Sequence, residues 1–154
     1  MAVRPVDGSS KKSTILLIMN YTEAFGKYGA KLANPQWSVS AIGADGNLVV
    51  CFWQDHLKPG AEKSTWEYKD VLSGWLGNFS GRKEFATHLQ SAKDQRLLLN
   101  LVIAHPASGI DALRVGKIAD ESSINKTFSV REDVVGHLLC FDGDALHVVF
   151  RRAV

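Results

Sequence analysis

The chain has 154 residues, of which 45% are hydrophobic and 22% are charged, and this size and composition predict one globular domain with its own core. The formal net charge is +2 and the pI is about 8.6, which permits an anionic partner without requiring one. No apolar run approaches the ~18 residues that a membrane span needs, and no signal-peptide pattern opens the chain. We therefore expect a cytoplasmic protein with no membrane partner.

The first 13 residues are polar and predict a flexible lead-in to a single domain over 14–154. Apolar residues then recur at helical spacing and predict a helix over about 14–33, which begins at Ser13 or Thr14 and ends before Pro35. Two glycines inside this range weaken the helix pattern. A strand over 14–20 followed by a shorter helix is the alternative.

Residues 37–53 predict a β-hairpin around Asp45-Gly46, a pair typical of a two-residue type I′ turn. This register assigns the buried face to Trp37, Val39, Ala41, Leu48, Val50 and Phe52. The opposite face then carries Ser38, Ser40, Ile42, Val49, Cys51 and Trp53. Trp53 is thus expected among serines, outside the core.

Residues 54–80 show less regular patterning. We expect a turn at 56–60, a short edge strand within STWEYKDV (64–71) and a glycine-rich loop, SGWLGNFSG (73–81). A long stretch with so little pattern is more often a binding segment than an inert connection.

The second half of the chain has clearer elements. A helix is predicted over 82–94, with Phe85, Leu89 and Ala92 facing inward, and the apolar run 97–104 predicts a central strand. A connector with a helical turn at 110–114 leads to a short strand over 126–131.

The chain ends in a second predicted hairpin. A loop at Gly143-Asp144 pairs Phe141 with Leu146 and Leu139 with Val148, which brings apolar residues onto one face. Together the elements predict an α+β fold with two main helices and a mixed, strongly curved sheet or partly open β-barrel.

Motifs for catalysis are weak in this sequence. There is no nucleophile elbow, phosphate-binding loop or zinc-ligand spacing, and Cys51 and Cys140 are expected to be reduced, partly buried thiols. Asp55 followed by Glu67 and Lys69 has the residue types of a Mg²⁺-dependent nuclease, although E-x-K is common by chance. We expect no metal and no cofactor, and treat the nuclease as one alternative.

Aromatic and basic residues lie close together in the sequence, as nucleic-acid stacking and phosphate contact require. The predicted binding residues are Trp53, Trp66, Tyr68, Trp75, Arg82, Lys83, Arg151 and Arg152. The leading hypothesis is therefore a non-enzymatic nucleic-acid-binding module, with DNA recognition foremost. A protein-interaction domain that uses exposed aromatic residues is the other alternative.

Two segments carry a resemblance to known proteins. EAFGKYGAKLANPQWSVSA (23–41) and FSVREDVVGHLLCFDGDALHVVFRR (128–152) resemble small uncharacterised bacterial and phage proteins, in turns and aromatic residues but not in a catalytic motif. The strand-rich ending is also similar, at the level of fold, to PUA-like domains that read modified bases in restriction systems. This resemblance implies a curved barrel and DNA recognition, but it assigns no residue a role.

Overall fold

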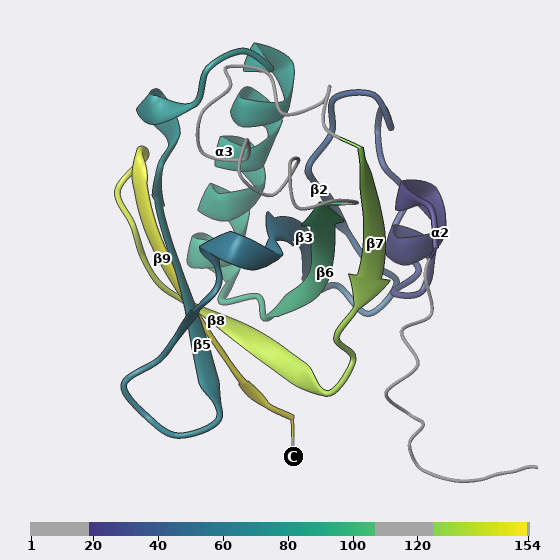
Figure 1. Cartoon of the computed structure of the whole chain (residues 1–154). Helices are drawn as coiled ribbons and strands as arrows, with labels where there is room; N and C mark the ends of the chain where they lie inside the picture. The colour runs from purple at the N-terminus through teal and green to yellow at the C-terminus, as the bar shows by residue number, and fades with distance from the viewer. Residues whose placement is uncertain (1–18, 107–124, 154) are drawn as a thin grey trace, which may run out of the picture.

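A computed structural model describes residues 19–106 and 125–153 (Figure 1). The predicted lead-in, the helical turn at 110–114 and nearly all of the alternative strand over 14–20 lie outside these residues. The described helices are α2 (Tyr21–Gly26) and α3 (Phe79–Gln95), with 3₁₀ turns η2 (Gln54–His56) and η3 (Leu72–Gly74). The strands are β2 (Ser40–Ile42), β3 (Leu48–Trp53), β4 (Lys58–Pro59), β5 (Thr65–Val71), β6 (Leu99–Pro106), β7 (Lys126–Val130), β8 (Val134–Phe141) and β9 (Ala145–Arg152).

The eight described strands form one mixed sheet in the order β2-β3-β6-β8-β9-β5-β4, with β7 also paired to β6. Within it β3 and β6 run parallel, and the other paired strands are antiparallel. The α+β class and the mixed sheet are confirmed, whereas the described strands do not close into a barrel.

The sheet consists of two halves that meet at one residue pair. In the described register β8 joins β6 at Leu99–Gly136, and β7 occupies the rest of that edge of β6, from Val102 to Pro106. In Figure 1, β5, β8 and β9 therefore gather on one side, and β3, β6 and β7 on the other.

The larger core fills the space between α3 and both halves of the sheet. Phe52 stacks on Tyr68 with ring centroids 3.7 Å apart, and its edge contacts Phe85 and Phe150. The predicted helix over 82–94 and the central strand are confirmed as α3 and β6, because Phe85, Leu89 and Ala92 are buried as expected.

A smaller core lies on the opposite face of β3 and β6, beneath α2. Phe25 of α2 packs there with Val49, Trp53, Val102 and Phe128. Trp53 is 9% exposed, so the expectation that it lies among serines outside the core is wrong.

The predicted helix over 14–33 is also wrong within the described residues. The Asn20 side chain caps α2 by accepting a hydrogen bond from the Glu23 backbone N–H, and the Glu23 side chain accepts one from the Asn20 backbone N–H. The helix therefore begins at Tyr21. It ends at Gly26, and Gly29 has φ +67°, in the left-handed region that closes helices. The shorter helix of the alternative is the one that forms.

The first hairpin has a register one residue away from the prediction. Ser40 pairs with Val50, and Ile42 with Leu48. Gly46 has a positive φ, of 87°, but Asp45 does not, so a type I′ turn is not formed. A longer loop instead spans the Gly43–Asn47 hydrogen bond, and Ser40 becomes fully buried.

The second hairpin follows the prediction at its tip, where Phe141 pairs with Leu146. A β-bulge then adds one residue, so Leu138 rather than Leu139 faces Val148, and Leu139 is 52% exposed. The predicted strand over 126–131 is confirmed as β7.

The predicted edge strand over 64–71 is β5, which pairs along its length with β9 and is flanked on its other side by the two-residue β4. Of the cysteines, Cys140 is exposed and Cys51 is half-buried. None of the described helices combines the length and the apolar character that crossing a membrane requires.

Candidate nucleic-acid interface

Trp66, near the start of β5, lies beside two arginines from other segments of the chain. The guanidinium carbon of Arg131 is 4.9 Å from the centre of the Trp66 ring, and that of Arg152 is 5.9 Å away. Trp66 itself is half-buried and packs with one part against the larger core. The structure therefore brings an aromatic ring and two cations together from three separate segments of the chain.

Asp133 holds the two arginines in place. Its carboxylate accepts two hydrogen bonds of 2.8 Å from Arg131, in a bidentate arrangement, and one of 3.1 Å from Arg152. The bonds from Arg131 hold the pKa of Asp133 below its ordinary value, and they raise that of Arg131. Two cations and one anion leave this cluster with a net positive charge.

A polar group lies next to this cluster, at the end of β6. His105 Nδ1 is 2.9 Å from the Gln54 side-chain oxygen, and Nε2 is 2.6 Å from the Ser129 hydroxyl. Because an amide oxygen only accepts, Nδ1 carries the proton and Nε2 accepts from Ser129. Burial lowers the pKa of His105, so the ring is neutral near pH 7.

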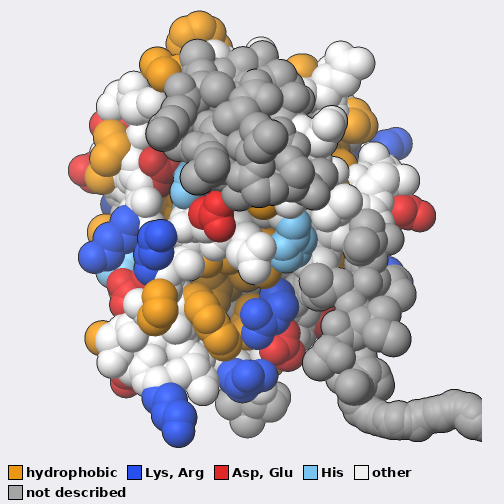
Figure 2. All heavy atoms as spheres, viewed as in Figure 1, with side chains coloured by type: hydrophobic (Ala, Val, Ile, Leu, Met, Phe, Trp, Pro, Cys, Tyr) orange, Lys and Arg blue, Asp and Glu red, His pale blue; other side chains and the backbone are white. Residues whose placement is uncertain are grey.

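These two groups share one face of the sheet. Ser129 and Arg131 are two residues apart along an extended segment, so their side chains point the same way, about 7 Å apart. Below η2 and between β5 and β7, Figure 2 shows a shallow hollow with exposed apolar side chains, a histidine at its upper border and basic side chains beside it. We call Trp66, Arg131, Arg152, His105, Gln54 and Ser129 the Trp66 face.

The predicted binding residues do not gather in one place. Trp53 and Tyr68 are 9% and 5% exposed and belong to the two cores, so neither ring offers a free surface for stacking. Trp66 and Tyr68 are two residues apart on β5 and point to the same face, but Tyr68 lies deeper, stacked on Phe52, whereas Trp66 lies at the margin of the core.

Arg151 and Arg152 point to opposite faces of β9. Arg151 pairs with Glu62, whereas Arg152 pairs with Asp133 and lies over Trp66. Adjacent strand residues alternate in direction, so this basic doublet does not act as a unit. Only Arg152 belongs to the Trp66 face.

Trp75, Arg82 and Lys83 lie at the far end of β5. Arg82 contacts the carbonyl oxygen of Leu72, the residue that follows β5, at 3.5 Å. Leu72 is six residues beyond Trp66, which is about 20 Å along a strand. These three residues therefore belong to a different surface from Trp66.

The nuclease residues are not brought together as a metal site. Asp55 is exposed in η2, and Glu67 accepts hydrogen bonds from His147 and from the Ala61 backbone, which lower its pKa. Within 19–106 and 125–153, no group of three or more His, Cys, Asp or Glu side chains could hold a metal ion.

Sequence reasoning missed Arg131, Asp133 and His105. The spacing Arg131-x-Asp133 just before a strand was a usable signal, since opposite charges two residues apart are close enough to form an ion pair. The contact of His105 with Gln54 and Ser129 joins three distant segments, and no local pattern indicates it.

Comparison with protein-family models, with curated proteins and with solved structures finds no match to this chain. The resemblance to PUA-like domains therefore stays a prediction, and function has to be argued from the Trp66 face itself.

Proposed function

We propose that this protein binds nucleic acid through the Trp66 face. The observation that carries the proposal is the Trp66 ring, half-buried and flanked by Arg131 and Arg152. Base stacking on an aromatic ring combined with phosphate contact by arginine is the common chemistry of single-strand recognition. The cluster is positioned in advance, because Asp133 already orders both arginines.

Arg152 is the better phosphate ligand of the two arginines. Its side chain is 60% exposed and makes a single hydrogen bond to Asp133, which leaves further N–H donors for a phosphate oxygen. Arg131 is 30% exposed and has two donors engaged by Asp133, so it orients the cluster, and a base stacks on the part of the ring that the arginines leave exposed.

Gln54 supplies a hydrogen-bonding group for a base edge. It is exposed, its side-chain oxygen is occupied by His105, and no described residue accepts a hydrogen bond from its amide NH₂. A donor of this kind on the same face as a stacking ring favours an unpaired base over a duplex, whose bases are already stacked and paired. We therefore assign single-stranded nucleic acid as the preferred ligand.

The proposal is tested by fluorescence anisotropy with labelled 20-nucleotide single-stranded DNA, single-stranded RNA and duplex DNA at low salt. Trp66→Ala should weaken single-strand binding by about 1–3 kcal/mol, and Trp66→Phe should retain more of it because a ring remains. Circular dichroism confirms that each variant is folded. The absence of binding to all three probes, or equal binding by Trp66→Ala, contradicts the proposal.

A further inference from the structure

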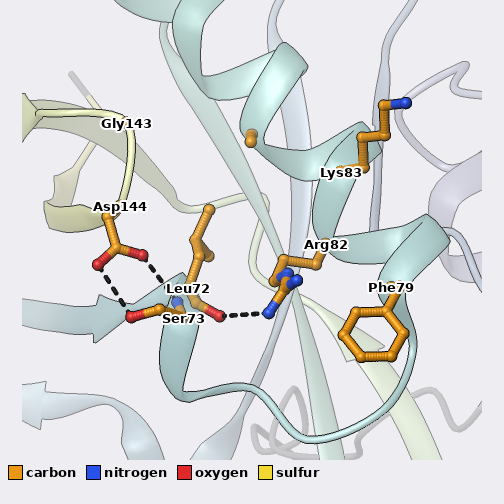
Figure 3. A pocket seen from close by; sticks show the side chains of 8 residues that line it. Leu72, Ser73, Phe79, Arg82, Lys83, Gly143 and Asp144 are labelled. Atoms are coloured by element: carbon orange, nitrogen blue, oxygen red, sulfur yellow. Dashed lines mark hydrogen bonds between the residues drawn. The ribbon is translucent and has the colours of Figure 1, made fainter.

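A second surface lies at the start of α3, away from Trp66. Here η3, the first turns of α3 and the tip of the β8–β9 hairpin enclose an open pocket of about 460 Å³ (Figure 3). Phe79, Arg82 and Lys83 of α3 lie on one side of it, and Ser73 and Asp144 on the other.

Specific hydrogen bonds hold the segment that leads into this pocket. Asp70 accepts 2.7 Å and 2.6 Å bonds from the Trp75 indole and the Tyr68 hydroxyl, and the Trp75 ring stacks on Phe85. At the start of α3, the Asn78 side chain donates to the carbonyl of Trp37 and accepts from Gly81. The segment over 72–81 is thus fixed to the domain at both ends.

This anchored segment nevertheless exposes large apolar side chains. Leu76 and Phe79 are each 66% exposed. A flexible loop could fold such residues inward, but here the anchors hold them in water. A large apolar side chain held in water at the side of a pocket, as Phe79 is, is typical of a protein interaction site.

The charges of the pocket favour an acidic ligand. Both carboxylate oxygens of Asp144 are engaged by the Ser73 backbone N–H and hydroxyl, at 2.7 and 3.0 Å. Arg82 and Lys83 form no ion pair with any described acid, and Arg82 lies 4.8 Å from the Phe79 ring centre. Arg82 and Lys83 carry two positive charges and Asp144 carries one negative charge, so the pocket has a net positive charge.

We infer that this pocket binds an acidic segment of a partner protein, in which a bulky apolar side chain contacts Phe79 while flanking carboxylates pair with Arg82 and Lys83. Nucleic acid fits less well. Leu72, Phe79 and Ala86 give the pocket an apolar lining, which a bulky apolar side chain fills and a charged phosphate backbone does not. The inference is independent of the Trp66 face.

The test selects peptides from a display library of random 12-residue sequences on the immobilised full chain. The expected outcome is enrichment of peptides with Asp or Glu on both sides of a Leu, Phe or Trp. The best enriched peptide is then synthesised with a fluorophore, and its Kd is measured against variants of the protein.

Phe79→Ala and the double variant Arg82→Gln/Lys83→Gln should each raise the peptide Kd about tenfold or more, because each removes one half of the contact. Lys31→Gln, which removes an exposed lysine from the segment after α2, should leave the Kd unchanged. No enrichment, enrichment without acidic residues, or equal loss in Lys31→Gln would overturn the inference. Binding of a labelled single-stranded oligonucleotide that Arg82→Gln/Lys83→Gln loses and Lys31→Gln keeps would assign the pocket to nucleic acid and overturn the inference as well.

Discussion

The Phe150 ring packs against the backbone of Gly136, in the space that a side chain at this position would fill. A Cβ atom at Gly136 would lie 2.6 Å from Cε1 of Phe150 and 3.0 Å from the Leu99 Cβ. Phe150 is fully buried, so its ring cannot move aside into solvent. This glycine also forms the pair that joins the two halves of the sheet. The close packing where the two halves meet thus depends on a residue without a side chain.

Gly136→Ala should therefore reduce the free energy of unfolding by about 1–3 kcal/mol, the usual cost of an overpacked core. Urea denaturation followed by circular dichroism measures this change. Gly26→Ala is the matched control, since a Cβ there meets nothing within 4 Å and alanine favours the helix. Equal stability of Gly136→Ala and the native chain would show that the two halves are not packed this closely.

The second prediction compares the loss of stability when a buried and an exposed phenylalanine are each replaced by alanine. Phe52→Ala should reduce the free energy of unfolding by about 3–5 kcal/mol, because Phe52 stacks on Tyr68 and contacts Phe85 and Phe150. Phe79→Ala should change it by about 0.5 kcal/mol or less, because Phe79 is 66% exposed. Denaturant melts of both variants check the pair. Similar losses in the two would contradict the assignment of Phe79 to a binding surface.

A third prediction concerns pH. Burial lowers the folded-state pKa of His105 below its ordinary 6.5. Between the two pKa values the imidazole is therefore protonated in the unfolded chain and neutral in the folded chain. The stability from neutral His105 is complete above pH 6.5 and is lost as the pH falls towards the lower folded-state pKa. His88 contributes in the same direction, since burial also lowers its pKa.

His105→Gln should therefore flatten the decrease in unfolding free energy between pH 7.5 and 5.5 without abolishing it. Urea melts at pH 7.5, 6.5 and 5.5 provide the measurement. A steeper pH dependence in His105→Gln would mean that the native ring is protonated and that its hydrogen bonds to Gln54 and Ser129 are assigned the wrong way.

The long elements of the fold were predictable because their periodic patterns agree with their packing. Phe85, Leu89 and Ala92 recur on one face of a 17-residue helix, and the apolar run in β6 is covered on both sides. The first hairpin was not predictable in register. Asp45-Gly46 suits a two-residue loop as well as a longer one. The observed register pairs Ser40 with Val50 and buries Ser40 beneath α3, where its hydroxyl is 2.7 Å from His88 Nδ1.

The candidate sites were predictable only in part, for the same reason. Composition indicated that aromatic and basic residues matter, and Trp66 and Arg152 do lie together. Which aromatic rings reach the surface depends on long-range strand pairing, which turned Trp53 and Tyr68 inward and brought Arg131 from a distant segment to Trp66. A local pattern carries no information on such contacts.

The most direct test of the Trp66 face compares Arg152→Gln with Arg151→Gln in single-strand binding over a series of salt concentrations. Both variants remove one positive charge from the same strand, but only Arg152 faces Trp66. Arg152→Gln should weaken binding and make the log–log salt slope shallower by about 0.7, the value for one phosphate contact on a single strand, whereas Arg151→Gln should keep the native slope. Equal slopes in the two variants, or a larger change in Arg151→Gln, would contradict nucleic-acid binding through this face.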